Sequence, residues 1–282
     1  MRICRFDRGS EKDRLGVVEG DKVHDVSAVI DLIEPVRWPV PMGDRMIAAL
    51  PVLRPKMEEL IKSGSAKSYA LSDVRLNAPI ANPSKFFCGA GNWPEHKEQM
   101  GGKNMRNLGW LHKTTNALAG PADDVILTRP GRVTFYEAEL ATIIGKEAKN
   151  VAAKDALDYV AGYAACLDMS MQGEENFSHN KCYDTFGVIG PWMVTTDEIP
   201  DPRPLTFRFY VNDVQKQGDK IERLVLSVEE MIEFASGVAT LYPGDVIMSG
   251  TPIGISQVFP GDVMRLEFDV IGTMVNKVAG VV

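Results

Sequence analysis

The sequence predicts an α+β protein in which strands of a large mixed sheet dominate and helices are few. Three observations support this class. Short runs rich in β-branched and aromatic residues recur along the chain, whereas clear helical periodicity is rare. The chain has 282 residues, of which 45% are hydrophobic, so it can bury a sizeable core. A stretch with two prolines, NAPIANPSK, separates a predicted small N-terminal domain at 1–76 from a larger domain at 77–282.

The predicted N-terminal domain begins with strands. We expect one strand over MRICRF and a hairpin over RLGVVEGDKVHDVS that turns at residues 19–21. A proline-rich passage, EPVRWPVPMGD, follows. The next segment, RPKMEELIKSG, is predicted to be a helix that ends at Gly64.

The predicted larger domain begins with an apolar strand in KFFCGAGN. The glycine-containing segment after it has poor periodicity, so we expect a loop or lid with a short helix near 94–100. Strands are then predicted in DDVILT, TFYEAELATIIG and YVAGYAACLDMS, the last preceded by a short helix near 153–158. Two later segments, PGDVIMSG and PGDVMRLEF, repeat a turn-then-strand pattern of hairpin type.

The clearest helix signal lies in SVEEMIEFASGVATL. Ser227 and Glu230 have the spacing of a capping box, in which each side chain accepts a hydrogen bond from the other residue's backbone. One face of the helix is apolar and is expected to be buried; it comprises Val228, Met231, Ile232, Ala235 and Val238.

Composition and charge argue against several classes of protein. The net charge of −7 and the lack of a basic stripe argue against a nucleic-acid partner. No apolar run approaches the roughly 18 residues that a membrane-spanning helix needs, and MRICRFDRGS lacks the apolar core of a secretory signal. The four cysteines form no paired metal motif, and GTPIG lacks the lysine of a phosphate-binding loop. We therefore expect a cytoplasmic protein with reduced thiols that has no membrane partner.

Two carboxylates interrupt the otherwise strand-like segment TFYEAELATIIG. Alternate residues of a strand face the same side, so Glu137 and Glu139 would share a face with Phe135 and Ala141. Burying both charges is unfavourable unless they share a proton, pair with basic side chains or bind a divalent cation. Asp168 ends the apolar run VAGYAACLD and could supply a third oxygen ligand of the kind that Mg²⁺ and Ca²⁺ prefer.

The residues alone leave a second interpretation open. Glu137 and Glu139 could lie on an exposed face, with Asp168 capping a turn, because acidic residues are mostly solvated. Zinc chemistry is disfavoured, since the four histidines show no ligand spacing of a zinc site.

Several motifs resemble, in order and spacing, those of the fumarylacetoacetate hydrolase (FAH) family. They are KFFCGAGNWPEH, YEAELATIIGKEAKNV, VAGYAACLDMS, KCYDTFGVIGPWMVTTDEIPDP and LYPGDVIMSGTPIGI, and they run from about residue 85 to the C-terminus. The resemblance implies a β-rich catalytic domain, built on a large mixed sheet or β-roll, a smaller N-terminal domain and a homodimer. It also implies a Mg²⁺ or Mn²⁺ ion, or sometimes Ca²⁺, held at the positions of Glu137, Glu139 and Asp168.

The same resemblance implies roles for further residues. His96 matches a histidine that activates water as a general base, and Lys181 matches a lysine that holds the substrate carboxylate or stabilises an oxyanion. Lys113 matches a lysine at the end of the lid that meets the substrate. Gly250 and Thr251 match a loop whose backbone amides and hydroxyl bind a substrate carboxylate.

The sequence departs from the family pattern at positions near the expected substrate. Gln172 stands where many members have an arginine, so a charged bidentate contact to a carboxylate is lost, although the amide can still bind the substrate. Glu175 stands at the position of a glutamine and would add negative charge unless it pairs with Lys181 or His179. Gln99 replaces the glutamate that supports the histidine in several members, although Glu98 is adjacent.

One further departure lies next to the lid lysine. Thr114 replaces a usual proline after the lid lysine. These departures put the substrate, and to a lesser extent the reaction, in question, whereas the three metal-ligand positions match the family.

Three hypotheses follow from the sequence. The leading one is a divalent-metal-dependent hydrolase that cleaves a C–C bond in an acylpyruvate-like or 1,3-diketo acid. The alternative is a decarboxylase, isomerase or dehydratase that acts on a 2-keto acid or 2-keto-3-deoxy sugar acid through a metal-stabilised enolate. The third is a catalytically impaired homologue that serves as a binding or scaffold protein, which would have no need of three intact carboxylates.

Overall fold

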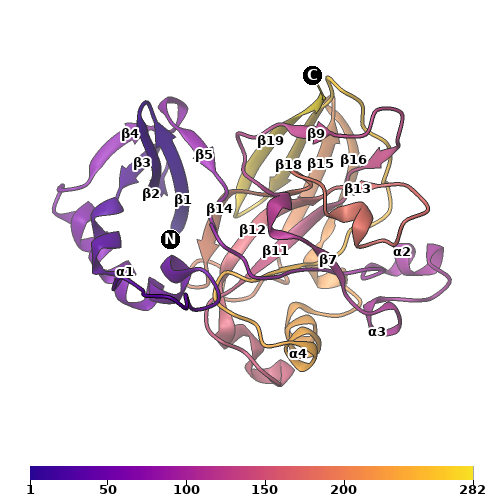
Figure 1. Cartoon of the computed structure of the whole chain (residues 1–282), viewed down its shortest axis with the longest axis horizontal. Helices are drawn as coiled ribbons and strands as arrows, with labels where there is room; N and C mark the ends of the chain where they lie inside the picture. Colours follow the sequence, from indigo (N-terminus) through magenta and orange to yellow (C-terminus); the bar gives the residue numbers. More distant parts are fainter. Residues whose placement is uncertain (282) are drawn as a thin grey trace.

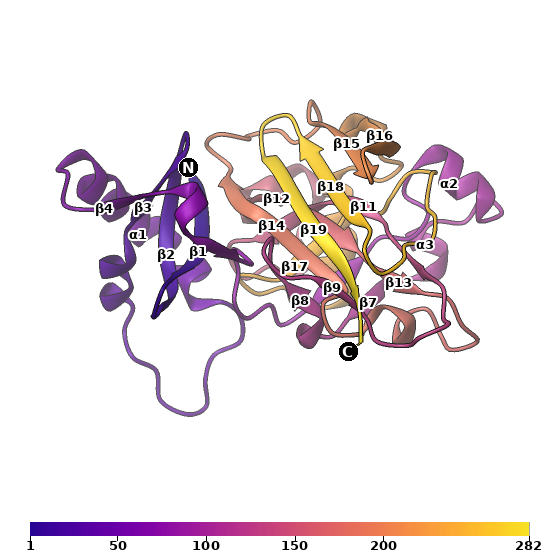
Figure 2. The same cartoon turned by 90° about the horizontal axis from the view of Figure 1, so that it is seen from above.

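The computed structural model describes residues 1–281 and arranges the strands of the chain in three β-sheets with a few helices around them (Figure 1). The sheet-rich α+β class predicted from the sequence is confirmed. The N-terminal elements form one lobe and the remaining elements a larger one, as the two orthogonal views show (Figures 1 and 2).

The N-terminal lobe contains the hairpin that the sequence predicts. Its strands are β1 (Arg2–Arg8), β2 (Glu11–Glu19), β3 (Lys22–Asp25), β4 (Lys67–Ala70) and β5 (Arg75–Asn77). β2 and β3 pair antiparallel and turn at residues 20 and 21. β1 also pairs antiparallel with β14 (Gly187–Thr195), so the N-terminal strands continue the sheet of the larger lobe.

Helix α1 (Arg45–Lys62) begins earlier than predicted and follows the 3₁₀-helix η1 (Ser27–Leu32). The predicted start near residue 54 is wrong, because the helix continues through two prolines, Pro51 and Pro55, that normally break helices. Its true start is set by Asp44, whose side chain accepts from Met46 N and Ile47 N at 2.9 and 3.2 Å. Burial of one face also stabilises the helix; it comprises Ile47, Leu50, Leu53 and Met57.

The largest sheet has twelve strands and is mixed, with both parallel and antiparallel pairs. Besides β1–β5 and β14, its strands are β6 (Phe86–Cys88), β7 (Leu111–Lys113), β8 (Leu118–Ala119), β11 (Ala138–Ile144), β12 (Val160–Asp168) and β17 (Val246–Met248). Their main order is β4-β3-β2-β1-β14-β12-β11-β17-β6-β7. Every residue of β11 and of β14 is buried, as expected for strands covered on both faces.

A second, five-stranded sheet packs on the large one. It has the order β16-β15-β18-β19-β9, from β9 (Val125–Leu127), β15 (Thr206–Val211), β16 (Val214–Lys220), β18 (Val263–Phe268) and β19 (Gly272–Gly280). Phe207 and Leu266 of this sheet share a core with Leu140 and Leu167 of the large sheet. On the opposite face, α1 shares a second core with residues such as Ala141. The central strands are therefore enclosed, which explains their continuous apolar sequence.

The other elements are short. They are η2 (Leu71–Asp73), α2 (Pro94–Gln99), α3 (Met105–Leu108), η3 (Thr115–Ala117), η4 (Ala153–Tyr159), η5 (His179–Lys181), η6 (Ile221–Arg223) and α4 (Val228–Val238). The predicted short helices near 94–100 and 153–158 correspond to α2 and η4. The capping box of α4 is present, with Ser227 Oγ accepting from Glu230 N and Glu230 Oε2 accepting from Ser227 N. Val238 is 59% exposed, so its predicted burial is wrong: it lies at the end of the helix.

Two strand predictions need correction. The segment at 134–145 is not one strand, because β10 (Thr134–Phe135) pairs with β13 (Ser170–Met171) in a separate two-stranded sheet before β11 begins. Tyr136 and Glu137 lie between the two strands. The repeated PGDV segments enter different sheets: β18 forms a hairpin with β19, but β17 lies between β11 and β6. Among the helices of the described residues, none is long and apolar enough to cross a membrane.

Candidate metal and active site

The three acidic residues singled out in the sequence converge at one end of the large sheet. Asp168 is the last residue of β12, Glu139 lies near the start of β11, and Glu137 lies just before β11. The backbone N–H of Asp168 donates to the Glu137 carbonyl at 2.9 Å, which ties the two strand ends together. One carboxylate oxygen from each of the three residues lies within 4.8 Å of the others.

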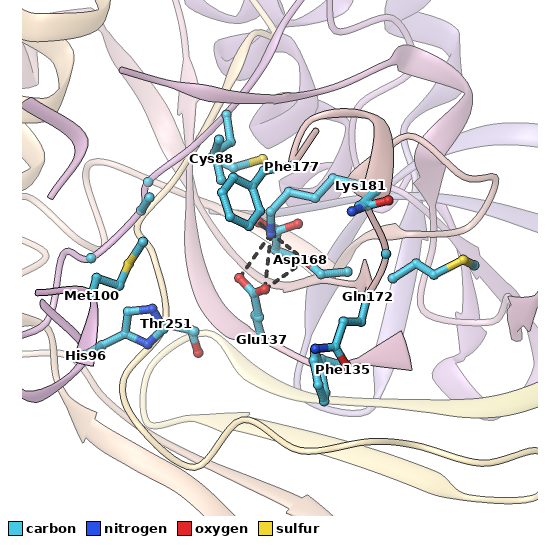
Figure 3. Close-up of a pocket in the computed structure, with 18 residues that line it drawn as sticks. Cys88, His96, Met100, Phe135, Glu137, Asp168, Gln172, Phe177, Lys181 and Thr251 are labelled. Carbon is cyan, nitrogen blue, oxygen red and sulfur yellow. Dashed lines mark hydrogen bonds and ion pairs between the residues drawn. The ribbon is translucent and has the colours of Figure 1, made fainter. Parts of the chain in front are cut away.

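Lys181 contacts two of these carboxylates, Glu137 and Asp168 (Figure 3). Its Nζ donates to Asp168 Oδ2 at 2.7 Å and to the two Glu137 oxygens at 3.2 and 3.1 Å. It also donates to Ser170 Oγ at 2.6 Å, and that hydroxyl donates to Glu137 Oε1 at 2.7 Å. Burial alone would lower the pKa of Lys181, but the charges of Asp168 and Glu137 outweigh it and raise the pKa.

The buried side chain of Lys113 also contacts this cluster. Its buried Nζ lies 2.6 Å from Asp168 Oδ1 and donates to the carbonyls of Met169 and Lys181 at 2.9 and 3.1 Å. Although burial opposes ionisation of Asp168, Lys113 and Lys181 together lower its pKa. Lys113 does not line the cavity in front of the carboxylates, so the geometry gives no support to direct contact between Lys113 and a substrate.

The electrostatics of Glu139 fit a cation site. Glu139 is fully buried, and its Oε2 accepts from Gly250 N at 2.6 Å. Its Oε1 has no hydrogen-bond partner among residues 1–281. Burial, together with the charges of Asp168 and Glu137, raises the pKa of Glu139 well above its ordinary value. Three carboxylates face two ammonium groups here, so an all-oxygen donor set with residual negative charge suits a hard divalent cation.

His96 lies at the same cavity, on the short helix α2 (Figure 3). Burial lowers the pKa of His96 below its ordinary value of 6.5, and the charge of Glu137 only partly offsets this. Its Nδ1 has no hydrogen-bond partner within the described part of the chain, so neither Glu98 nor Gln99 supports the imidazole there. The ring therefore binds a proton less readily than a solvated imidazole, and no carboxylate hydrogen-bonds to its Nδ1.

The loop predicted to bind a substrate carboxylate is already engaged with the protein. Gly250 N–H is taken by Glu139, and Gly250 does not line the cavity. Thr251 does line it, but its hydroxyl donates to the Ala138 carbonyl at 3.1 Å and accepts from Gln217 Nε2 at 2.8 Å. These contacts fix Glu139 and the strand that carries it.

Gln172 lines the cavity as expected, and Glu175 finds a partner other than the two residues considered for it. Glu175 pairs with Arg132 at 2.8 Å rather than with Lys181 or His179. Arg132 lowers the pKa of Glu175 to about 2, so this carboxylate is ionised and compensated. The negative charge at this position is therefore neutralised by a residue that the motifs did not include.

The cavity has a volume of about 260 Å³, which is the size of a small-ligand site. Glu137, Asp168, Ser170 and Lys181 form much of its polar part, whereas Glu139 is buried behind the lining. Sequence reasoning missed the side chains that supply much of the rest, namely Met100, Leu111, Phe177 and Asn180. Ser170 could have been found from its place two residues after Asp168, but no periodicity marks Met100 or Phe177 in their irregular segments.

Residues 85–279 match the family model described as fumarylacetoacetate (FAA) hydrolase, C-terminal. The chain belongs to the FAH family. A maleylpyruvate hydrolase from Aquipseudomonas alcaligenes is 39% identical to it over 100% of both chains. A mitochondrial oxaloacetate tautomerase from Xenopus laevis is 36% identical over 73% of this chain and 69% of that protein.

A solved structure of similar fold carries a metal ion. It is the crystal structure of maleylpyruvate hydrolase from Sphingobium sp. SYK-6 in complex with manganese(II) ion and pyruvate. That structure is 38% identical to this FAH-family chain, covers 99% of each chain and has a TM-score of 0.85. The trio of Glu137, Glu139 and Asp168 fits a divalent metal of this kind.

Proposed function

We propose that this protein is a divalent-metal-dependent hydrolase that cleaves the C–C bond of an acylpyruvate or related 1,3-diketo acid such as maleylpyruvate. The observation that carries the proposal is the convergence of Glu137, Glu139 and Asp168 beside a cavity that Lys181 and His96 line. The full-length similarity to a maleylpyruvate hydrolase supports the substrate class.

The three carboxylates would hold Mg²⁺ or Mn²⁺. A divalent cation, when bound, polarises the keto oxygens of the substrate and stabilises the negative charge that develops as the C–C bond breaks. Glu139 and Asp168 are held rigidly for this role by the Gly250 amide and by Lys113. Lys113, Gly250 and Thr251 are thus proposed to act by fixing the ligands and their loop.

His96 would accept a proton from a water molecule as the water adds to the acyl carbonyl carbon. The electron pair of the cleaved C–C bond then forms the enolate of pyruvate, and protonation at carbon gives pyruvate and a carboxylic acid. Lys181 would place its positive charge beside the developing oxyanion, and Gln172 would contact the acyl part of the substrate.

The test is turnover of a substrate panel by Mn²⁺- or Mg²⁺-loaded protein. Maleylpyruvate and other acylpyruvates, oxaloacetate and 2-keto-3-deoxy sugar acids would be followed by loss of enol absorbance and by product masses. We expect pyruvate plus a carboxylic acid from the acylpyruvates, with Glu137→Gln as the inactive control. Turnover of oxaloacetate or the sugar acids alone would contradict the proposal.

One observation favours a second function, enolate chemistry without hydrolysis. His96 Nδ1 has no carboxylate partner among the described residues, which weakens the support for a general base that activates water. A decarboxylase, isomerase or dehydratase of a 2-keto acid would not need that step. The similarity to an oxaloacetate tautomerase is consistent with this alternative.

We further propose a small N-terminal domain at 1–76, a catalytic domain at 77–282, a homodimeric assembly and a cytoplasmic location. The end of β5 at Asn77 and the start of the family match at residue 85 support the boundary, although β1 pairs with β14 across it. The resemblance to the FAH family supports the dimer, which light scattering on the purified protein would test. Microscopy of the tagged protein in cells would test the location.

A further inference from the structure

Arg132 fixes the segment that follows β13. Its Nε and Nη2 donate to the Gln172 carbonyl at 2.9 and 2.8 Å, and its Nη1 and Nη2 donate to the Glu175 carboxylate at 3.2 and 2.8 Å. The backbone N–H of Gln172 donates in turn to the Val133 carbonyl at 2.8 Å. Both polar groups of the Gln172 backbone are therefore bound to the residues that immediately precede β10.

Gly173 provides the space for this arrangement. A Cβ atom at Gly173 would overlap Arg132 Nη2 and Glu175 Oε2, so the ion pair passes directly over the glycine. The backbone of Gly173 is outside the left-handed region that favours glycine. Its small size is thus needed for the Arg132–Glu175 ion pair and not for the backbone conformation.

The side chain of Gln172 is free to contact a ligand. It lines the cavity (Figure 3), and its amide makes no hydrogen bond to any residue that the structure describes. Lys181 and Ser170, by contrast, are bound to the carboxylates at the proposed metal end. If the 2-keto acid lies at that end, the Gln172 amide faces the remainder of the substrate.

We propose that Arg132 is a positioning residue. By binding the Gln172 backbone it holds the side-chain amide of Gln172 in place, so that this side-chain amide recognises the acyl end of the substrate. The inference rests on the proposed function. A neutral amide can donate to a carboxylate or carbonyl oxygen, and fixing its backbone in advance reduces the entropy lost when the substrate binds. The ion pair also keeps the Glu175 charge from repelling an anionic acyl end.

The test compares Arg132→Gln and Gly173→Ala with wild type in the Mn²⁺-loaded protein. Gly173→Ala keeps both charges but displaces the ion pair. It therefore shows whether the position of the ion pair affects KM when neither charge is removed. We expect each variant to raise KM for the acylpyruvate about tenfold, which corresponds to about 1.4 kcal/mol. The kcat, the Kd for Mn²⁺ and inhibition by pyruvate, which occupies only the keto-acid end, should stay unchanged. Arg203→Gln is a matched control, because its surface ion pair with Asp201 lies outside the cavity.

A double-mutant cycle decides between positioning and general stability. If the Arg132 contact acts through Gln172, then Gly173→Ala, which keeps both charges of the ion pair, combined with Gln172→Ala will raise KM no further than Gln172→Ala alone. Additive effects, or a lower Tm with unchanged KM, would overturn the proposal.

If another 2-keto acid proves to be the substrate, the proposed function fails, but the same cycle on that substrate still tests Arg132. If nothing is turned over, calorimetric Kd values for a 2,4-diketo acid replace KM.

Discussion

Replacing Lys181 with methionine tests the electrostatic balance of the carboxylate cluster. The ammonium group lies 2.7 Å from Asp168 and 3.1 Å from Glu137, and the side chains of Lys181 and Asp168 are 6% and 1% exposed. Removing one partner of a buried ion pair costs about 3–5 kcal/mol, because the other charge is left buried without compensation. For a chain of this size each kcal/mol lowers Tm by about 2–3 °C, so we expect a drop of about 6–15 °C without metal.

Mn²⁺ should reverse much of the drop in Tm that Lys181→Met causes. A divalent cation supplies the positive charge that the Lys181→Met variant lacks, and binding stabilises the folded state by about 4 kcal/mol at a thousand times Kd. The measurement is thermal unfolding at pH 8 in EDTA and in saturating Mn²⁺. Catalytic activity should not return with the metal, because the ammonium group is also needed beside the oxyanion.

Lys85→Met is the matched control for the Lys181 variant. Lys85 Nζ lies 3.0 Å from the buried carboxylate of Asp245, away from the cavity. Its replacement should lower Tm equally with and without Mn²⁺. Two results would contradict this electrostatic role of Lys181. One is an equal Tm for wild type and Lys181→Met in EDTA, and the other is a Tm difference between them that Mn²⁺ leaves unchanged.

Further predictions concern a metal ligand, the proposed base and the cap of α4. Glu139→Gln should abolish Mn²⁺ binding in calorimetry, and retained affinity would contradict its role as a ligand. Because burial and neighbouring carboxylates raise the Glu139 pKa above 4.5, the metal-free protein should lose stability as pH rises through the folded pKa. The Tm measured in EDTA would show this fall, and Mn²⁺ should suppress it. Since the His96 pKa is below 6.5, the acid limb of kcat/KM should lie below pH 6.5, where protonation removes the base. His96→Asn should lower kcat by about 10²–10⁴ without weakening Mn²⁺ binding, and an unchanged kcat would exclude the base role. Ser227→Ala should cost about 1 kcal/mol in denaturant unfolding through loss of the α4 cap, while KM stays unchanged.

Features set by local interactions could be predicted from the sequence. The β2–β3 hairpin and the α4 capping box depend on residues within a few positions of each other, and both occur where expected. The start of α1 was mispredicted because Pro51 and Pro55 suggest a break, whereas the Asp44 cap and the buried face outweigh their cost. Asp44 is a local signal for that start, but burial of the helix face, which helps it to outweigh the two prolines, depends on tertiary packing.

The residues of the site also fall into those that the sequence could reveal and those that it could not. The carboxylates at 137, 139 and 168 could be identified from an unusual placement of charge in apolar strands and from family motifs. The Arg132–Glu175 ion pair joins residues 43 positions apart, so sequence spacing alone could not show that Glu175 is compensated. The break between β10 and β11 was also hidden, because the β10–β13 pairing depends on a distant strand.

The most direct test is a crystal structure of the protein with Mn²⁺ and pyruvate, with data collected at the manganese absorption edge. We expect one anomalous peak at ligand distance from carboxylate oxygens of Glu137, Glu139 and Asp168, with pyruvate beside it. An anomalous peak elsewhere, or none at saturating Mn²⁺ while these oxygens stay paired only with Lys181 and Lys113, would contradict it.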